Sequence, residues 1–260
     1  MRLFSQSISS EWSLSRFIYR LGFKLFSAVY RFAEVLRFLP RRLLFLAEHI
    51  GEGLKWVDAR FRNPQATSRL LGGISYWWVE FFLLVLDCLG ISEVYELLSD
   101  LVKFNSRPLH PWELEIAKSV FGSTIAYHRI RIDESAWIGP PQYHFCYVSF
   151  YTINAWGPMN NSLLVHELMH VWQYQNKGIV YIPRALNAMH SKAGYDYGGL
   201  ACLKEVKAQN GSLFDFNYEQ QADIVADYYR IKNGYSPNWG NAIYQDLSVY
   251  EYFIGFLQAS

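Results

Sequence analysis

The first third of the chain alternates basic and apolar positions at helical spacing. Between Trp12 and Ile50, basic side chains recur at or near every fourth position and apolar side chains occupy the other faces. The basic positions are Arg16, Arg20, Lys24 and Arg31, and the apolar ones are Phe17, Leu21, Leu25, Phe32, Leu36 and Leu39. We expect one or two amphipathic helices broken at Pro40, since proline removes a helical hydrogen bond. They would pack on the rest of the protein, or else dock on a membrane surface or a partner.

The most apolar window of the chain is Gly73 to Gly90. It is short for a bilayer span, and it contains Glu80 and Asp87, which are costly in hydrocarbon. The pattern therefore predicts a buried helix. Insertion into a membrane stays open for a toxin or another membrane-active protein.

A proline-containing stretch from Asn105 to Pro111 has few residues suited to packing and is typical of a linker. We place a domain boundary there, between a helical region of residues 1–105 and a domain of residues 106–260. In the second domain the pattern changes between helical spacing and aromatic or β-branched runs. The expected elements are a helix from Glu113 to Phe121 ended by Gly122, strands over Thr124–Asp133 and Phe145–Trp156, and helices over 162–177 and 217–232. The predicted fold class is α+β.

Charge also divides the chain, at about residue 70. The net charge is only +1, but residues 1–70 hold 12 Lys and Arg against 5 Asp and Glu, and the remainder holds 12 against 18. A basic N-terminal region suits an anionic membrane surface, nucleic acid or an acidic partner. The acidic remainder argues against a domain that binds nucleic acid, so we predict no nucleic-acid partner.

Cysteine usage and the N-terminus bear on location. Cys88, Cys146 and Cys202 are an odd number without CxxC spacing, which predicts neither a disulfide framework nor a cysteine zinc knuckle. Charged residues such as Glu11 and Arg16 interrupt every early apolar run, so the apolar core of a secretory signal is missing. We expect synthesis in a reducing compartment such as the cytoplasm, followed by export through another route or a peripheral position at a membrane.

The segment from Leu163 to Gln173 carries the clearest chemistry, the motif HExxH within a helical pattern. On a helix, His166 and His170 lie one turn apart on one face, so both imidazoles can reach one zinc ion. Glu167 lies about 100° around the helix, beside the open coordination position, where it can act as a base. Three polar groups on an apolar helix are costly to bury unless a metal or hydrogen-bond partners satisfy them.

Catalytic zinc usually has three protein ligands, so a third is required. On the later helix, Glu219, Asp223 and Asp227 follow one another at four-residue steps along one face. Such a stripe also suits a solvated helix surface, and Asp196 and His190 remain alternative third ligands. Cys146 is a further candidate, as an inhibitory thiolate on the metal, although a buried strand cysteine is the simpler interpretation.

HExxH followed by Glu-x-x-x-Asp on a later helix resembles the gluzincin family of zinc metallopeptidases. The resemblance implies a zincin-like fold, a Zn²⁺ cofactor, Glu219 as third ligand and Asp223 as the residue that orients a ligand histidine. It also implies a side chain that stabilises the oxyanion, and the candidates are Tyr195, Tyr197, Tyr218 and His190. Each of these four has the alternative role of a packed residue.

A second resemblance covers about residues 108–232. The runs PWELEIAKSVFG, YHRIRI, HELMHVWQYQ and YEQQADIVADYY are similar to a bacterial group with a HELTHVWQ-type core. That group is described as Vgr-related or Rhs-associated, which implies a link with type VI-like secretion. Partners would then include a secretion apparatus, a chaperone or an immunity protein.

The resulting hypothesis is a zinc-dependent peptide-bond hydrolase exported as an effector or toxin through a contractile secretion system. A peptide or protein would be the substrate, and it would add as an extra strand beside Phe145–Trp156. Two alternatives remain open. One is a non-enzymatic secretion adaptor with a structural zinc site, and the other is a membrane-associated housekeeping peptidase with its N-terminal helices on the bilayer.

Overall fold

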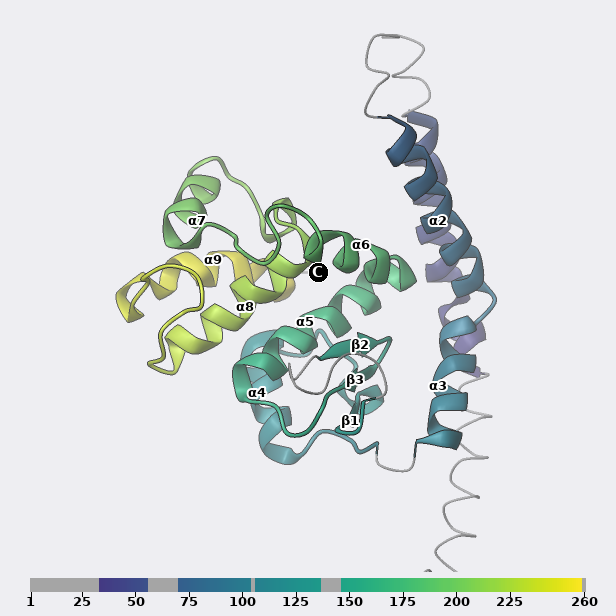
Figure 1. Cartoon of the computed structure of the whole chain (residues 1–260), viewed down its shortest axis with the longest axis horizontal. Helices are drawn as coiled ribbons and strands as arrows, with labels where there is room; N and C mark the ends of the chain where they lie inside the picture. The colour runs from purple at the N-terminus through teal and green to yellow at the C-terminus, as the bar shows by residue number, and fades with distance from the viewer. Residues whose placement is uncertain (1–32, 56–69, 104–105, 137–145, 259–260) are drawn as a thin grey trace, which may run out of the picture.

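The computed structural model describes residues 33–55, 70–103, 106–136 and 146–258. Within them, residues 33–55 are helical, and the chain continues through helices on one side of the molecule to a small sheet and a helical body (Figure 1). The first elements are α2 (Leu70–Cys88), α3 (Ile91–Val102), α4 (Pro111–Phe121), the 3-10 turn η1 (Tyr127–Arg129), β1 (Arg131–Asp133), β2 (Tyr147–Ser149) and β3 (Thr152–Asn154). The prediction for residues 12–32 lies outside the described residues.

The second half of the described chain is helical. It contains α5 (Asn161–Lys177), η3 (Gly178–Val180), α6 (Tyr181–Met189), α7 (Gly199–Ala208), η4 (Leu213–Asp215), α8 (Tyr218–Lys232), η5 (Tyr244–Asp246) and α9 (Leu247–Gln258). The predicted helices over 113–121, 162–177 and 217–232 are confirmed to within two residues at each end. Together with the small sheet they confirm a mixed α+β class, while the zincin-like assignment stays a prediction.

Helix α5 occupies the centre of the body, with α8 packed along it and the sheet on another side (Figure 1). Every residue of α5 from Leu164 to Tyr174 is buried, and α4, α6, η3, β2 and β3 also contact this helix. A helix enclosed in this way is apolar on most faces, and its polar residues need partners within the protein. The HExxH motif therefore lies in the hydrophobic core.

The sheet has the strand order β1-β3-β2, with β1 parallel and β2 antiparallel to β3. Two strand predictions need correction. Only Arg131–Asp133 of the first expected strand is extended, because η1 takes up the residues before it. Within the second, the described residues form a hairpin of β2 and β3, which turns at Phe150 with φ of 62°. Ser149 then faces Thr152 across the turn.

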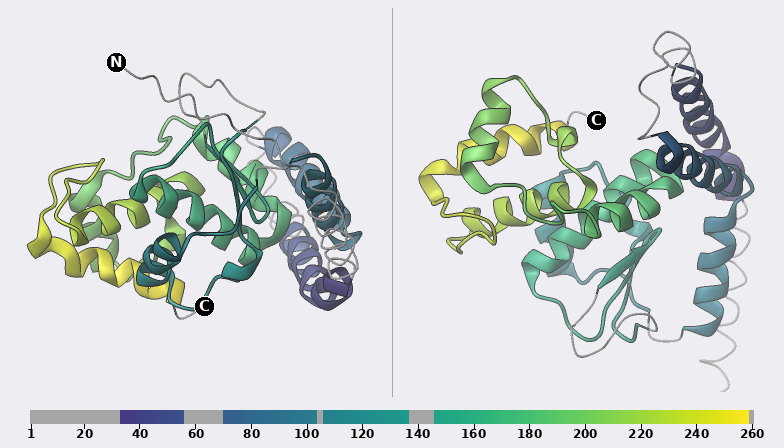
Figure 2. Two further views of the ribbon diagram at one scale, coloured as in Figure 1. Left: turned by 90° about the horizontal axis from the view of Figure 1, so that it is seen from below. Right: turned by 45° about the horizontal axis from the view of Figure 1, so that its top comes forward.

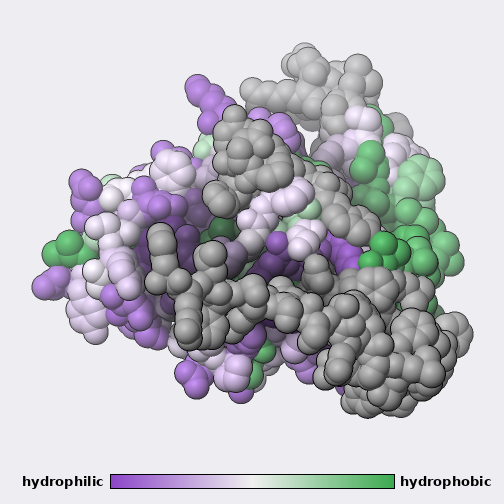
Figure 3. Space-filling view, turned by 60° about the horizontal axis from the view of Figure 1, so that its bottom comes forward, coloured by the Kyte–Doolittle hydropathy of each residue, from purple (hydrophilic) through white to green (hydrophobic). Residues whose placement is uncertain are grey.

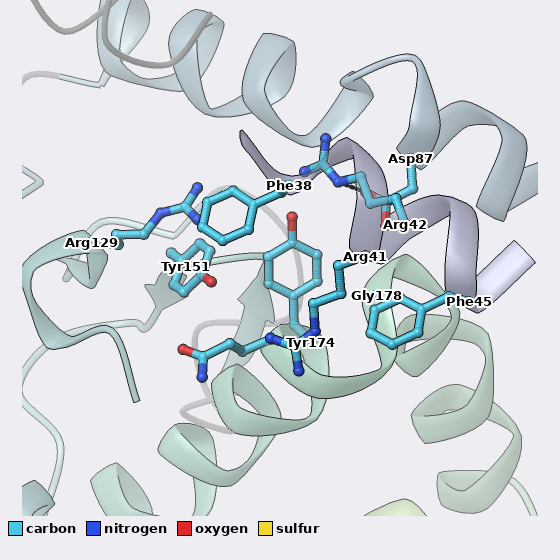
Figure 4. Close-up of a pocket in the computed structure, with 10 residues that line it drawn as sticks. Phe38, Arg41, Arg42, Phe45, Asp87, Arg129, Tyr151, Tyr174 and Gly178 are labelled. Atoms are coloured by element: carbon cyan, nitrogen blue, oxygen red, sulfur yellow. Dashed lines mark ion pairs between the residues drawn. The ribbon is translucent and has the colours of Figure 1, made fainter. Parts of the chain in front are cut away.

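The segment 33–55 also differs from expectation, because it passes through Pro40 as one helix. Side chains on both sides of the proline hold it against the body. The ring centroid of Phe38 lies 5.0 Å from the guanidinium carbon of Arg129, and Arg42 pairs with Asp87 (Figure 4). Arg42 also pairs with Glu93. These tertiary contacts keep the helix intact despite the hydrogen bond that proline removes.

Helix α2 was expected to be buried and is not. It lies at one side of the molecule beside segment 33–55 (Figure 2), and the rings of His49 and Trp77 stack between the two helices. Trp78 and Phe82 are exposed, whereas Glu80 and Asp87 are buried against the protein. None of the described helices combines the length and the apolar character needed to cross a membrane.

Candidate metal centre

Two capped helices present the polar residues of the site to each other. Helix α5 begins where the Asn160 side chain accepts a hydrogen bond from the Leu163 N–H, and it ends at Gly178, whose φ is 73°. Helix α8 begins where the Asn217 side chain accepts from the N–H groups of Glu219 and Gln220. Such caps satisfy backbone donors that the first helical turn leaves unpaired. The second cap thereby positions Glu219 in the first turn of α8.

Three potential ligands converge between these helices. The nitrogen or oxygen atoms that His166, His170 and Glu219 offer lie within 4.8 Å of one another, and all three residues are buried. Nε2 of His166 and Nε2 of His170 are each 3.3 Å from Oε2 of Glu219. That oxygen has no hydrogen-bond partner of good geometry among the described residues. The structure thus brings together the three residues that the motif and the acidic helix predicted.

The far side of each imidazole is held by a second group. Nδ1–H of His166 donates to Oδ1 of Asp223 over 2.8 Å, as the gluzincin resemblance implied for that aspartate. Nδ1–H of His170 donates over the same distance to Oε1 of Gln173, whose amide NH₂ donates in turn to Oε1 of Gln221. Because both Nδ1 atoms are engaged, Nε2 is the ring nitrogen that each histidine directs toward Glu219 and could offer to a metal ion.

Asp223 is itself held by a residue from the loop after α8. The indole N–H of Trp239 donates to Oδ2 of Asp223. Asp227, one turn further along α8, accepts hydrogen bonds from the backbone N–H groups of Asn238 and Trp239 and from the hydroxyl of Tyr197. The acidic stripe of α8 therefore has three roles: Glu219 faces the histidines, Asp223 orients His166, and Asp227 fixes the loop that carries Trp239.

Glu167 lies beside this cluster with its carboxylate buried. It is 3% exposed, and its Oε2 has no hydrogen-bond partner among the described residues. Burial raises the pKa of Glu167 above 4.5, although His166 and His170 act in the opposite direction. A carboxylate with a raised pKa holds a proton more readily than a solvated one, which suits a group that accepts and then passes on a proton.

A pocket of about 320 Å³ opens at the cluster. Its walls include His166, Glu167, Asp223 and Tyr195, together with Cys146 at the start of β2. Burial, and then Glu167, raise the pKa of the Cys146 thiol to about 12, and the group of converging ligand atoms does not include its sulfur.

The electrostatics of the cluster favour positive charge. Burial lowers the pKa of His166, but the carboxylates of Asp223 and Glu219 beside its imidazole outweigh burial and raise that pKa to about 10. Burial raises the pKa of Glu219, but the two histidines lower it well below 4.5. Three carboxylates around two imidazoles therefore call for a cation.

The donor set can be compared with what metals prefer. Two imidazole nitrogens with fixed tautomers and one carboxylate oxygen are the ligands of a common catalytic zinc site, which keeps one position open. The unpartnered Oε2 of Glu219 and the two inward-facing Nε2 atoms fit such an ion. The residues present are therefore suited to hold zinc.

The structure places the four candidates for oxyanion stabilisation in different surroundings. Tyr195 lines the pocket, and its ring centroid is 6.0 Å from that of His166. Tyr197 is buried away from the cluster, where its hydroxyl contacts Asp227 and the hydroxyl of Tyr250.

The other two candidates have structural partners. The hydroxyl of Tyr218 accepts a hydrogen bond from Arg184, and Nδ1 of His190 contacts the carbonyl oxygen of Leu186 at the end of α6. Asp196, an alternative third ligand, is exposed and caps the N–H of Gly198. Of these residues, only Tyr195 lines the pocket.

Gln173 and Trp239 are the residues that sequence reasoning missed. The sequence could have indicated Gln173, because this residue lies three positions after His170 within the HELMHVWQ run and so faces the same side of α5. No sequence pattern indicated Trp239, since a loop residue 16 positions beyond Asp223 has no periodic relation to it.

The described fold and site define a mixed α+β protein with a buried His-His-Glu cluster beside a pocket. No family model matches the chain, and no solved structure matches it. Among curated proteins, it is similar to the type VI secretion system spike protein VgrG2b of Pseudomonas aeruginosa, with 28% identity over 152 residues. The match covers 52% of this chain and 14% of that protein, so the chain spans a small part of its relative. This similarity supports the Vgr-related part of the predicted resemblance.

Proposed function

We propose that this chain is a zinc-dependent peptide-bond hydrolase with a secretion-associated role. The observation that carries the proposal is the meeting of Nε2 of His166, Nε2 of His170 and Oε2 of Glu219, with both Nδ1 atoms already engaged. Glu167 supports it with a buried, unpartnered carboxylate oxygen at the same pocket. A purely structural site would not need this fourth group.

Zinc, when bound, would supply a Lewis acid that acidifies water and polarises a carbonyl group. The chain's own residues would do the rest. Oε2 of Glu167 would take a proton from the attacking water and deliver it to the leaving amine. Tyr195 would donate a hydrogen bond to the developing oxyanion, and β2, at an edge of the sheet, would align an extended peptide.

The similarity to a type VI spike protein supports the secretion-associated part of the proposal. We infer that the chain acts in the context of a type VI apparatus, as an effector or toxin on a target cell. Partners would be the apparatus, and a chaperone or an immunity protein. Export through that apparatus would need no secretory signal peptide.

The test compares wild type with Glu167→Gln, because an amide matches the carboxylate in shape but cannot accept the proton of water. Expressed at matched levels in the cytoplasm and in the periplasm, wild type should reduce survival in at least one compartment. Glu167→Gln should abolish that effect while zinc content and melting temperature stay unchanged. Glu115→Gln, an exposed carboxylate on α4, is the matched control and should behave as wild type.

Identical survival with wild type and Glu167→Gln, when wild type is toxic, would refute the hydrolase and support a secretion adaptor with a structural zinc site. A survival assay is preferred to generic peptides because binding energy from a specific target is often required for turnover.

A further inference from the structure

The helices at one side of the molecule bury charged residues and expose apolar ones. In α2, Glu80 and Asp87 are 4% and 1% exposed, whereas Trp78 and Phe82 are 48% and 60% exposed. An ordinary surface helix directs its apolar residues to the core and its charges to water. In segment 33–55 the buried residues are likewise polar, namely Glu34, Arg42 and His49, although other charged residues of this segment are exposed.

The apolar stripe of α2 is continuous along the helix. Ile74, Trp78, Phe82 and Leu86 are all exposed and follow one another at four-residue steps, which places them in a line. Val79 widens the stripe. Ser75 is the one polar exposed side chain among those described in α2.

Helix α3 follows α2 on the same side of the molecule (Figure 1), and it also exposes apolar residues. Leu89, between the two helices, is 72% exposed, and Ile91, Val94, Leu98 and Val102 are exposed along α3. We call the exposed apolar residues of α2, Leu89 and α3 the outer face. Figure 3 shows hydrophobic surface gathered along this edge of the molecule.

The inward charges explain why the helices cannot simply rotate to bury the outer face. Nε and Nη2 of Arg184 donate to the two oxygens of Glu80, each over 2.7 Å. Between the helices, Arg42 pairs with Asp87 (Figure 4), and it also pairs with Glu93. Turning α2 would break these pairs and leave buried charges without partners, which is strongly unfavourable. The outward position of the apolar residues is therefore a built-in property of the fold.

We propose that the outer face lies on an anionic lipid bilayer, with α2 and α3 in the plane of the interface. None of the side chains described in α2 and α3 is both charged and exposed, whereas the rim of a protein interface is polar. Inward-facing paired charges with apolar residues outward are the arrangement of proteins in lipid. Since no described helix can span a bilayer, the contact is interfacial.

Charge complementarity favours an anionic bilayer. Residues 1–70, which lead directly into α2, hold 12 Lys and Arg against 5 Asp and Glu. Basic residues next to a membrane-contacting segment are attracted by anionic lipids, and salt weakens that attraction. The lining of the candidate metal pocket contains no residue of α2 or α3, so membrane contact does not depend on the proposed hydrolysis.

The test is flotation of the full chain with vesicles of phosphatidylcholine and phosphatidylserine, and with vesicles of phosphatidylcholine alone. Wild type should float with the anionic vesicles, and added salt should weaken the binding. Trp78→Gln with Phe82→Gln should lower the vesicle-bound to free ratio at least about tenfold, because two large apolar contacts are lost. A second pair, Phe82→Gln with Leu98→Gln, covers the case in which the first pair fails to fold.

The matched control is Trp112→Gln with Tyr244→Gln, which removes two exposed aromatic side chains elsewhere, 47% and 64% exposed. These variants should float as wild type does. The proposal is overturned if folded wild type stays unbound, or if folded variants of the outer face float as wild type does. It is equally overturned if wild type is a dimer that these variants convert to a monomer without any lipid binding, because a second copy would then cover the outer face.

Discussion

Asp223→Asn isolates the contribution of a residue that orients a ligand without touching the ion. Oδ1 of Asp223 accepts from Nδ1–H of His166, and Oδ2 accepts from the indole N–H of Trp239. Asparagine has one acceptor oxygen and one NH₂ group. In the variant, the NH₂ must face one of these two donors, so either His166 or Trp239 loses its acceptor.

The magnitude follows from these contacts. Leaving a buried donor unsatisfied costs about 1–3 kcal/mol, and the lower end applies here because Trp239 is half-buried. Loss of a residue that supports a ligand typically lowers metal affinity roughly 10- to 100-fold. We therefore expect Asp223→Asn to weaken zinc binding by about one to two orders of magnitude, in a chain that still folds.

A double-mutant cycle separates the geometric cost from the loss of charge. In a Trp239→Phe background the competing donor is absent, so the asparagine can present its oxygen to His166. In that background, Asp223→Asn should reduce the free energy of zinc binding by about 1 kcal/mol less than it does in the wild-type background. Zinc affinity would be measured by competition with a chromophoric chelator at fixed pH. Equal losses in both backgrounds, or no loss in either, would refute the assigned hydrogen bonds.

Three further outcomes follow. Tyr195→Phe should lower hydrolysis and leave zinc content unchanged, as measured on the same samples, because the hydroxyl would act on the oxyanion. Tyr197→Phe should instead lower the free energy of unfolding by about 1–3 kcal/mol in urea titrations, because its hydroxyl donates to buried Asp227. Burial raises the pKa of Glu113, but Arg107 lowers it further, to a net value below 4.5. In acid titrations, the stability advantage of wild type over Glu113→Gln should persist above pH 4.5 and vanish as pH falls through that lowered pKa.

The candidate site was predictable where chemistry and helical spacing coincide. His166, Glu167 and His170 have fixed spacing on one helix, and Glu219 and Asp223 have fixed spacing on another. These two helical patterns therefore predicted five residues that the structure brings together. Which aromatic side chain faces the pocket depends on how loops fold, and spacing does not reveal it.

Other features depended on tertiary contacts that no local pattern contains. Pro40 lies within a helix because contacts on both sides hold that helix, and the expected strand over Phe145–Trp156 contains a hairpin because Phe150 adopts a positive φ. The apolar content of α2 indicated burial, but ion pairs with Arg42 and Arg184 turn its charges inward. Hydrophobicity alone does not reveal which face of a helix the protein covers.

The central claim is tested most directly by the zinc content of the purified full chain. Wild type should hold about one zinc per chain. His170→Ala and Glu219→Ala should lose it, because each removes one of three converging ligands. Asp196→Ala, an exposed carboxylate, should retain it. A folded, toxic wild type without zinc, or a Glu219→Ala variant that keeps its full zinc content, would contradict the account.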